Sequence, residues 1–465
     1  MRRSLRLMAV LLAVTSCAGS TAPSLRAAEL QADWVSAPAT ARSASIDAAW
    51  WRSFGDPVLD ELIVVAERRN LDLRLADARI REARALRQGA GAELFPQLNG
   101  SAGISTGRTV GVGGAVLERT AATLGVEASW EADVFGRLRA ETRAADAVWA
   151  ATVADRDGVR LTLVAEVARA YLEFRLYRTQ HTLAEANAKG AEETLRIARA
   201  RFEQGIASRL DVERALTARG ETRARVAQLA EFAESSRHRI VLLLATTPEE
   251  LGGVLSETGA LPSASALGVL LTPTEVVGLR PDVRAAEARL LASIARREAA
   301  EALRYPRISL GSMLGLQSGS DGAAVLSAPS LLWSLGANLL APLLDFGRIR
   351  AMIDAADARQ EQAYLSYELT ARVGLQEVQT ALILYTQGEL RRSELADATE
   401  SARRAVGLAR RQYTEGTLSL LEVLDAERTL YTLELQAVQA TADVSLRLVS
   451  LYQTMGLMPP NPEAA

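Results

Sequence analysis

Few residues of this 465-residue chain have the types and spacing that catalysis or metal binding needs. The only histidines are His181 and His238, which lie far apart in the sequence, and the only cysteine is Cys17. The sequence contains neither a Cys/His cluster with metal-ligand spacing nor a glycine-rich phosphate-binding loop. We therefore interpret both histidines as packing or surface residues, and we predict neither an enzyme nor a bound cofactor.

One acidic pair has a spacing that bears on function. Glu422 and Asp425 lie three residues apart, so they share one face of a predicted helix just after a turn. A solvated helix face explains most pairs of this kind. If several copies of the chain met around an axis, the same residues would instead form a ring of carboxylates that favours cations. The sequence alone leaves both interpretations open.

The acidic pair belongs to a long stretch without proline, bounded by Pro342 and Pro459. The one clear break signal within it is Gly416, with Ser419 shortly after as a helix cap. An unbroken helix of about 110 residues would be about 165 Å long, far longer than a compact domain. The stretch therefore predicts two very long helices that fold into a hairpin at Gly416.

A second hairpin of the same kind is predicted between Pro96 and Pro248, with its break at Gly205 and Ser208. In the first helix of each hairpin, apolar residues recur at spacings of three and four, which is typical of a coiled-coil seam. These residues are Val164, Val167, Tyr171 and Phe174 in one hairpin and Leu375, Val378, Leu382 and Tyr385 in the other.

The two hairpins are parts of an internal duplication. The hexapeptide at residues 135–140 recurs in similar form at residues 346–351, an offset of 211. Two further blocks recur in the same order with offsets of 210 and 211. They are Asp72, Arg74, Ala78, Arg79 and Pro96, matching Asp282, Arg284, Ala288, Arg289 and Pro306, and Gly205, Ser208, Asp211 and Val212, matching Gly416, Ser419, Glu422 and Val423. The chain is therefore predicted to contain two copies of one helix–strand–helix module.

Each module also contains segments in which apolar residues alternate with small or polar ones. Two such segments lie within residues 97–131 and two within residues 308–339. Each range therefore predicts a hairpin of two strands of about ten residues. That length suits a strand that crosses a membrane at a tilt. Four strands cannot close a barrel, so several copies must share one, and a trimer would supply twelve strands. The alternative is a small sheet packed on a helix bundle.

The N-terminus has the features of a secretory signal. Arg2, Arg3 and Arg6 precede a short apolar segment at residues 7–14, which is too short to span a bilayer. The sequence that ends in Cys17 resembles a bacterial lipobox, which implies lipidation of Cys17 after cleavage. An ordinary signal peptide with a chance cysteine is the alternative.

These signals divide the chain into six parts. We predict a signal peptide at 1–16, a lipid-anchored tether at 17–49 and a first repeat at 50–247. A waist linker follows at 248–273, then a second repeat at 274–456 and a C-terminal tail at 457–465. Within the first repeat, Asp56 and Pro57 are predicted to start one helix that runs to about Leu94.

The composition restricts the partners. The net charge is −3 and the isoelectric point is about 5.8, so no basic surface indicates nucleic-acid binding. Charged residues of both signs are mixed along the predicted helices, as expected for solvated faces.

At this point the sequence resembles a known family, the TolC-type outer-membrane efflux proteins. The resemblance rests on the residues around the second turn, 413–416 and 422–431, and on the duplicated layout of nearly the whole chain. Trp50-Trp51, residues 94–96 and the lipobox are similar to the lipoprotein (NodT-like) branch that serves tripartite RND pumps. The resemblance implies a mainly α protein with a membrane β part, in which three copies form a 12-stranded barrel continuous with a helical tunnel, or α-barrel, across the periplasm. It also implies a periplasmic adaptor and an inner-membrane RND pump as partners.

The resemblance assigns roles to the residues around the two turns. It implies that Glu422 and Asp425 form an acidic ring at the entrance. It also implies that an adaptor docks at the hairpin tips, whose small residues are Gly205, Ser208, Gly416 and Ser419. A hydrogen bond between Tyr413 and Asp211 is expected to hold neighbouring hairpins closed, although Leu418 stands where some members carry an arginine.

The function predicted from these features is that of a passive outer-membrane exit duct of an RND-type efflux pump. Two alternatives remain open: an outer-membrane component of type I protein secretion, and a lipid-anchored periplasmic scaffold without a pore. The transported substrate does not follow from the sequence.

Overall fold

The computed structural model describes residue 34 and most of residues 49–458. Residues 1–33, 35–48, 111–112, 115, 253–254, 256–258, 264–269, 318–330 and 459–465 lie outside this description. The predicted signal peptide, the lipidation site Cys17 and most of the predicted tether and tail are therefore outside the described residues.

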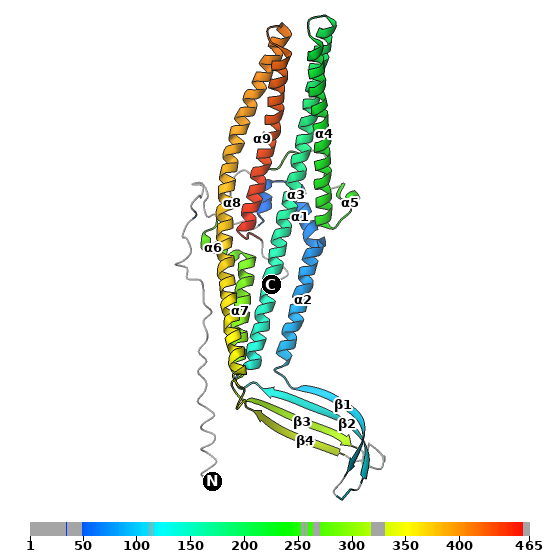
Figure 1. The fold of residues 1–465 in the computed structure, drawn as a ribbon, viewed down its shortest axis with the longest axis vertical. Helices are drawn as coiled ribbons and strands as arrows, with labels where there is room; N and C mark the ends of the chain where they lie inside the picture. Colours follow the sequence, from blue (N-terminus) through cyan, green and yellow to red (C-terminus); the bar gives the residue numbers. More distant parts are fainter. Residues whose placement is uncertain are drawn as a thin grey trace.

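The molecule is elongated, with two long helical hairpins side by side and a four-stranded sheet at the end opposite the hairpin tips (Figure 1). The first repeat contains η2 (Trp50–Phe54), α1 (Pro57–Arg69), α2 (Leu71–Ala92), β1 (Gln97–Val110), β2 (Val116–Ala132), α3 (Arg137–Glu203) and α4 (Arg209–Leu244). The short helices α5 (Pro248–Gly252) and α6 (Pro273–Leu279) lie between the repeats. The second repeat contains α7 (Pro281–Ala302), β3 (Arg307–Gln317), β4 (Leu331–Leu340), α8 (Arg348–Glu415) and α9 (Leu420–Thr454). The two predicted helical hairpins are confirmed.

Each repeat supplies one β-hairpin, as predicted, and the sheet order is β1-β2-β3-β4 with all neighbours antiparallel. The central pair, β2 and β3, joins the two repeats. The backbones approach closely there, because a Cβ atom on Gly315 would lie 2.8 Å from the carbonyl oxygen of Leu124. β3 and β4 have 11 and 10 residues, close to the prediction, but β1 and β2 have 14 and 17. The glycine-dense run after Gln97 stays in the ladder because glycine retains both backbone hydrogen-bonding groups.

The prediction of one helix from Pro57 to about Leu94 is wrong. The helix is interrupted at Asn70, whose backbone leaves the helical region at φ −56° and ψ 133°. Its side-chain oxygen accepts hydrogen bonds from the backbone N–H groups of Asp72 and Leu73, at 2.9 and 3.0 Å, and so caps the helix that follows. Its side-chain nitrogen donates to the carbonyl oxygen of Leu243 at 2.9 Å, where α4 ends. Asn is a preferred N-cap residue, so a local signal for the break was present, but the contact with Leu243 lies 173 residues away and cannot be predicted from local sequence.

Arg280 takes the same place in the second repeat, 210 residues after Asn70, between α6 and α7. Its buried guanidinium donates to the carbonyl oxygen of Thr454 at 2.7 Å, where α9 ends. Thr454 and Leu243 are 211 residues apart, so the two repeats make the same connection with different side chains. The guanidinium also forms ion pairs with Asp282 and Glu377, both at 2.7 Å. Arg280 thus connects the end of α9 with the start of α7 and with α8 in the middle of the molecule, which we call the waist.

The largest hydrophobic cluster also lies at the waist, and it contains most of the predicted seam residues of both hairpins. Trp50 stacks on Tyr452 with ring centroids 5.5 Å apart. The Tyr171 hydroxyl donates to the Asp56 carboxylate at 2.6 Å, and burial, followed by this contact, raises the pKa of Tyr171 well above its usual value. Asp56 also caps α1 by accepting from the backbone N–H of Val58 at 2.9 Å, so the predicted cap is confirmed. Among the described residues, no helix is both long enough and apolar enough to cross a membrane.

The packing around Arg280 predicts that Gly456 tolerates no side chain. Gly456 has a φ of +73°, and a Cβ atom there would lie 2.9 Å from the Cα atom of Arg280. Gly456→Ala should therefore lower the free energy of unfolding by about 1–3 kcal/mol or more, measured as a lower thermal unfolding temperature. Gly407→Ala is the matched control, because Gly407 lies within α8 with no atom within 4 Å of its Cβ position. The control should be neutral or stabilising by about 0.5–1 kcal/mol, and equal effects of the two changes would contradict this account.

Candidate functional site at the hairpin tips

The two hairpin tips have the same backbone geometry. Gly205 and Gly416 have φ values of +72° and +78°, in the left-handed region that glycine adopts without strain. The N–H of Ile206 donates to the carbonyl oxygen of Arg201, and the N–H of Thr417 donates to that of Gln412, both at 2.9 Å. These bonds satisfy carbonyl groups that the helix ends leave free. The glycines are therefore required by the turns, whatever else the tips do.

The helices after the turns begin with reciprocal caps. The Asp211 carboxylate accepts from the N–H and the hydroxyl of Ser208, at 3.1 and 2.7 Å. The Glu422 carboxylate accepts from the same two groups of Ser419, at 3.0 and 2.8 Å. The hydrogen bond from the Ser419 backbone, followed by that from its hydroxyl, holds the pKa of Glu422 below its usual range. Glu422 thus stays ionised when the pH falls into the range where an ordinary glutamate becomes protonated.

The structure places Glu422 and Asp425 on the exposed surface of the first turns of α9, as the sequence predicts for a shared face. It also shows contacts that sequence reasoning missed. Glu422 folds back onto Ser419, and Asp425 forms an ion pair with Arg428 at 2.8 Å. Arg428 therefore offsets part of the negative charge of this face in a single chain.

The predicted bond between Tyr413 and Asp211 is not formed within one chain. The Tyr413 hydroxyl is buried and has no hydrogen-bond partner among the described residues, and Asp211 is engaged by Ser208. The guanidinium of Arg201 lies over the Tyr413 ring, 4.6 Å from its centroid, and donates to the Tyr413 carbonyl oxygen. Burial raises the pKa of Tyr413. A closure bond between neighbouring hairpins of different copies remains a prediction.

A buried ionic cluster just below the tips was not predicted. Glu427 on α9 is buried and accepts from the Thr194 hydroxyl of α3 at 2.8 Å and from the Arg410 guanidinium of α8 at 2.7 Å. It therefore connects both hairpins. Burial, followed by the charge of Glu427, raises the pKa of the adjacent Tyr431 to about 12. The signal that could have revealed Glu427 is its phase, since it continues the buried 3-4-3 spacing of Leu420, Val423, Glu427 and Leu430.

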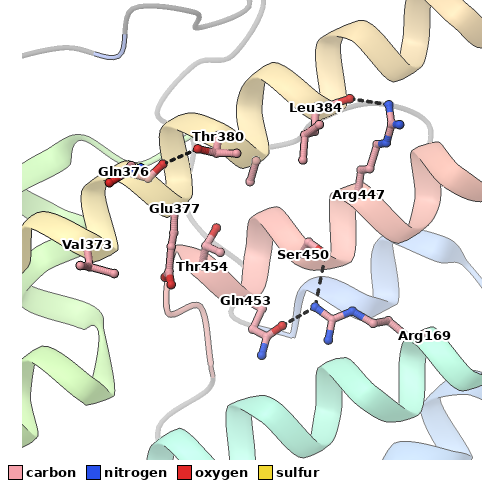
Figure 2. Close-up of a pocket in the computed structure, with 11 residues that line it drawn as sticks. Arg169, Val373, Gln376, Glu377, Thr380, Leu384, Arg447, Ser450, Gln453 and Thr454 are labelled. Atoms are coloured by element: carbon pink, nitrogen blue, oxygen red, sulfur yellow. Dashed lines mark hydrogen bonds between the residues drawn. The ribbon is translucent and has the colours of Figure 1, made fainter. Parts of the chain in front are cut away.

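A cavity of about 450 Å³ lies at the waist, between α3, α8 and α9 (Figure 2). Its basic side chains are already engaged: Arg169 donates to Ser450 at 3.3 Å and to Gln453, and Arg447 donates to the Leu384 carbonyl oxygen at 2.7 Å. No group of three or more metal-ligating side chains occurs in the part of the chain that the structure describes. The arrangement there provides packing and hydrogen bonding between helices.

The cluster at Glu427 predicts a local effect on stability. Glu427→Ala leaves the buried Thr194 hydroxyl and the Arg410 guanidinium without their acceptor, which should cost about 1–3 kcal/mol because Arg410 is half-exposed and can still reach water. Amide hydrogen exchange at both hairpin tips should become faster. Glu400→Gln is the control, since the Glu400–Arg404 pair is exposed on both sides and such pairs contribute about 0–1 kcal/mol. Unchanged exchange in the Glu427 variant would show that the cluster does not join the hairpins.

Comparison with known proteins agrees with this geometry. A family model described as "Outer membrane efflux protein" matches the chain twice, over residues 62–246 and 273–457. The pyoverdine export outer membrane protein OpmQ of Pseudomonas putida is 31% identical, over 98% of this chain and 97% of its own length. The cation efflux system protein CusC of Escherichia coli O6:H1 is 30% identical, over 88% of each chain.

Solved structures give the same result. The outer-membrane channel OprN superimposes with a TM-score of 0.88 at 32% identity, over 94% of this chain and 98% of that one. The two matched segments of the family model correspond to the two structural repeats, each with its strands and its long hairpin. The chain belongs to the outer membrane efflux protein family.

Proposed function

We propose that this protein is the outer-membrane exit duct of a tripartite RND-type efflux pump, and that it passively conducts small molecules across the periplasm and the outer membrane. The observation that carries the proposal is an open sheet joined directly to helical hairpins of unusual length, in a chain whose relatives are outer-membrane efflux proteins. A conduit needs no catalytic group, and we propose no enzymatic activity.

The proposed assembly is a homotrimer. Within the described residues, β1 and β4 are each paired on one side only, so the sheet has two free edges. In a membrane, each backbone N–H or C=O group without a hydrogen-bond partner costs several kcal/mol, so these edges need another strand. Three copies would bring twelve strands, and the exposed apolar side chains on one face of β4 would then face lipid. These side chains are Leu331, Trp333, Leu335 and Leu339.

The partners follow from the two ends of the molecule. We propose that a periplasmic adaptor docks at the tips around Gly205, Ser208, Gly416 and Ser419 and connects the duct to an inner-membrane RND pump. We further propose that lipidation of Cys17 anchors the chain in outer-membrane lipid. Incorporation of labelled palmitate that is lost in Cys17→Ser would support the anchor, and equal labelling of both proteins would refute it.

The proposed duct and its acidic ring can be tested together in planar bilayers. The unmodified protein should insert as trimers and conduct, whereas a scaffold without a pore would not. Glu422→Gln with Asp425→Asn removes both charges but keeps the side-chain shapes and the cap on Ser419. It should lower cation selectivity and weaken block by polyvalent cations.

The pKa of Glu422 adds a pH dependence to this test. A carboxylate with a lowered pKa is charged above that pKa and loses its charge as the pH falls through it. In an Asp425→Asn background, block should therefore persist at about pH 4.3, the usual value for glutamate, and disappear only at lower pH. If the double variant Glu422→Gln with Asp425→Asn showed the same cation selectivity and the same block as the unmodified protein, the acidic ring would be refuted.

Adaptor docking at the tips predicts a size effect. A Cβ atom at Gly205 would have no neighbour within 4 Å, and one at Gly416 would lie 3.8 Å from Arg201, so a large side chain projects from the tip. Gly205→Trp or Gly416→Trp should abolish drug resistance while trimers still form. Gly205→Ala and Gly416→Ala are matched controls, because they impose the same backbone strain of about 1–3 kcal/mol without the bulk. Normal resistance in the Trp variants would refute docking at these tips.

A further inference from the structure

Both repeats place the same two arginines where a strand gives way to a long helix. Arg137 and Arg139 begin α3, shortly after β2, and their repeat equivalents Arg348 and Arg350 begin α8, shortly after β4. Both junctions lie at the end of the sheet from which the long helices extend (Figure 1). The two junctions differ in the residues that surround these arginines.

In the first repeat, carboxylates of the same chain bind both arginines. The Arg137 guanidinium forms ion pairs with Glu131 at 2.9 Å and with Glu141 at 2.8 Å. The Arg139 guanidinium forms one with Asp133 at 3.0 Å. The cations of this junction are therefore already neutralised and are not available to an anionic ligand.

In the second repeat all three of these acids are replaced. At an offset of 211 residues, the replacements are Glu131 by Pro342, Asp133 by Leu344, and Glu141 by Met352. Arg348 and Arg350 are exposed, and neither forms an ion pair within the described residues. Arg348 instead approaches the Met352 sulfur, a weak acceptor, at 3.7 Å. The arginines have thus been kept while their partners have been lost.

One acid remains at the second junction, and its oxygens are engaged. The Asp345 carboxylate accepts from the backbone N–H groups of Gly347 and Ile349, at 3.1 and 2.8 Å, at the start of α8. Its charge acts on Arg348 from beyond the distance of an ion pair. With two arginines and one acid, residues 342–352 have a net charge of +1, whereas residues 131–141, with two arginines and three acids, have a net charge of −1.

The second junction is also apolar. Leu343 and Leu344 are 95% and 77% exposed, whereas their repeat equivalents Ala132 and Asp133 are half-buried. The two leucines follow Leu339, which belongs to the face of β4 that we propose to meet lipid. Exposed leucines beside unpaired arginines are typical of a surface that lies in the boundary region of a bilayer, with apolar groups among the acyl chains and cations at the headgroups.

We propose that the junction between β4 and α8 binds anionic phospholipids of the leaflet nearer the helices. Leu343 and Leu344 insert among the acyl chains, and Arg348 and Arg350 donate hydrogen bonds to the phosphate groups. The inference rests on the proposed function, because it requires the sheet to cross a bilayer. Its charge favours an anionic lipid over a zwitterionic one. Each copy has one such site, since the arginines of the first junction are engaged.

Quenching by brominated lipids measures which lipid occupies this junction. The full-length variant Leu343→Cys, in a Cys17→Ser background, is labelled with bimane and reconstituted as trimers in bilayers of phosphatidylglycerol and phosphatidylcholine. The acyl chains of one lipid at a time are brominated, so the quenching reports the local occupancy of that lipid. Because one arginine at an anionic surface contributes about fivefold to binding, we expect phosphatidylglycerol to be preferred by about fivefold or more at low salt.

Two variants of the labelled protein should reduce this preference to about one. Arg348→Gln with Arg350→Gln removes both cations. Leu344→Asp with Met352→Glu keeps both cations but restores two acids of the first repeat, and the second of these changes recreates the spacing of the Arg137–Glu141 pair.

Each variant has a matched control that should keep the preference. Leu344→Asn with Met352→Gln introduces side chains of the same shape as the restored acids, without their charge. Arg359→Gln with Arg411→Gln removes two exposed arginines from the same helix α8. The nearer of these, Arg359, is nine residues beyond Arg350, or about 14 Å along the helix.

The outcomes separate this inference from the proposed function. Equal quenching by the two lipids, or a preference that survives the loss of both arginines, would overturn the lipid site. Conducting trimers whose label no brominated lipid quenches would show that protein covers the junction, which would also overturn the site but leave the duct intact. Protein that neither inserts into bilayers nor conducts would overturn the proposed function and the inference with it.

Discussion

The free edges of the four-stranded sheet are the constraint on which the rest of this structure depends. Backbone groups on the outer sides of β1 and β4 have no partner strand within the described residues, and a bilayer offers none either. The strands lead directly into α3 and α8, so whatever brings two edges together also brings two helical hairpins together.

The waist shows how a duplicated chain conserves a connection while changing its chemistry. Asn70 and Arg280 occupy equivalent positions and reach the equivalent carbonyl groups of Leu243 and Thr454. An amide suffices in the first repeat, where it also caps a helix. In the second repeat a guanidinium makes the same bond and adds ion pairs with Asp282 and Glu377, which ties α8 to the start of α7. The larger donor set connects three elements where the amide connects two.

The tips combine rigid turns with a polar contact in the helical interior. Apolar residues at every buried position of α9 would be enough to pack this helix against its neighbours. Glu427 nevertheless occupies one of these positions and binds side chains of α3 and α8. A buried charge of this kind is stable only with its particular partners, so it specifies how the helices align rather than adding greatly to stability. Any motion that separates the two hairpins of one copy must break it.

The features determined by sequence alone are those that arise from local chemistry and from repetition. Gly205 and Gly416 mark the turns because only glycine adopts their backbone geometry freely, and Ser208 and Ser419 mark the helix starts because they cap them. Because the chain repeats with an offset of 210–211 residues, the weak signals for the turns, the helices and the strands each occur twice. This repetition made the hairpins, the strands and the family predictable.

Other features were decided only by the tertiary structure, because they depend on what lies opposite a residue. The break at Asn70 needs the end of α4, 173 residues away, as its acceptor. Glu427 shares the phase of the buried apolar residues of α9, but its partners Thr194 and Arg410 are known only from the packing of α3 and α8. Within one chain, the Tyr413 hydroxyl has no hydrogen-bond partner among the described residues. Ile383 and Leu172 have the same place in the repeat and similar character, yet one is exposed and the other buried. Periodicity shows that a helix has an apolar face, but only the packed chain shows which of those faces its own elements leave uncovered.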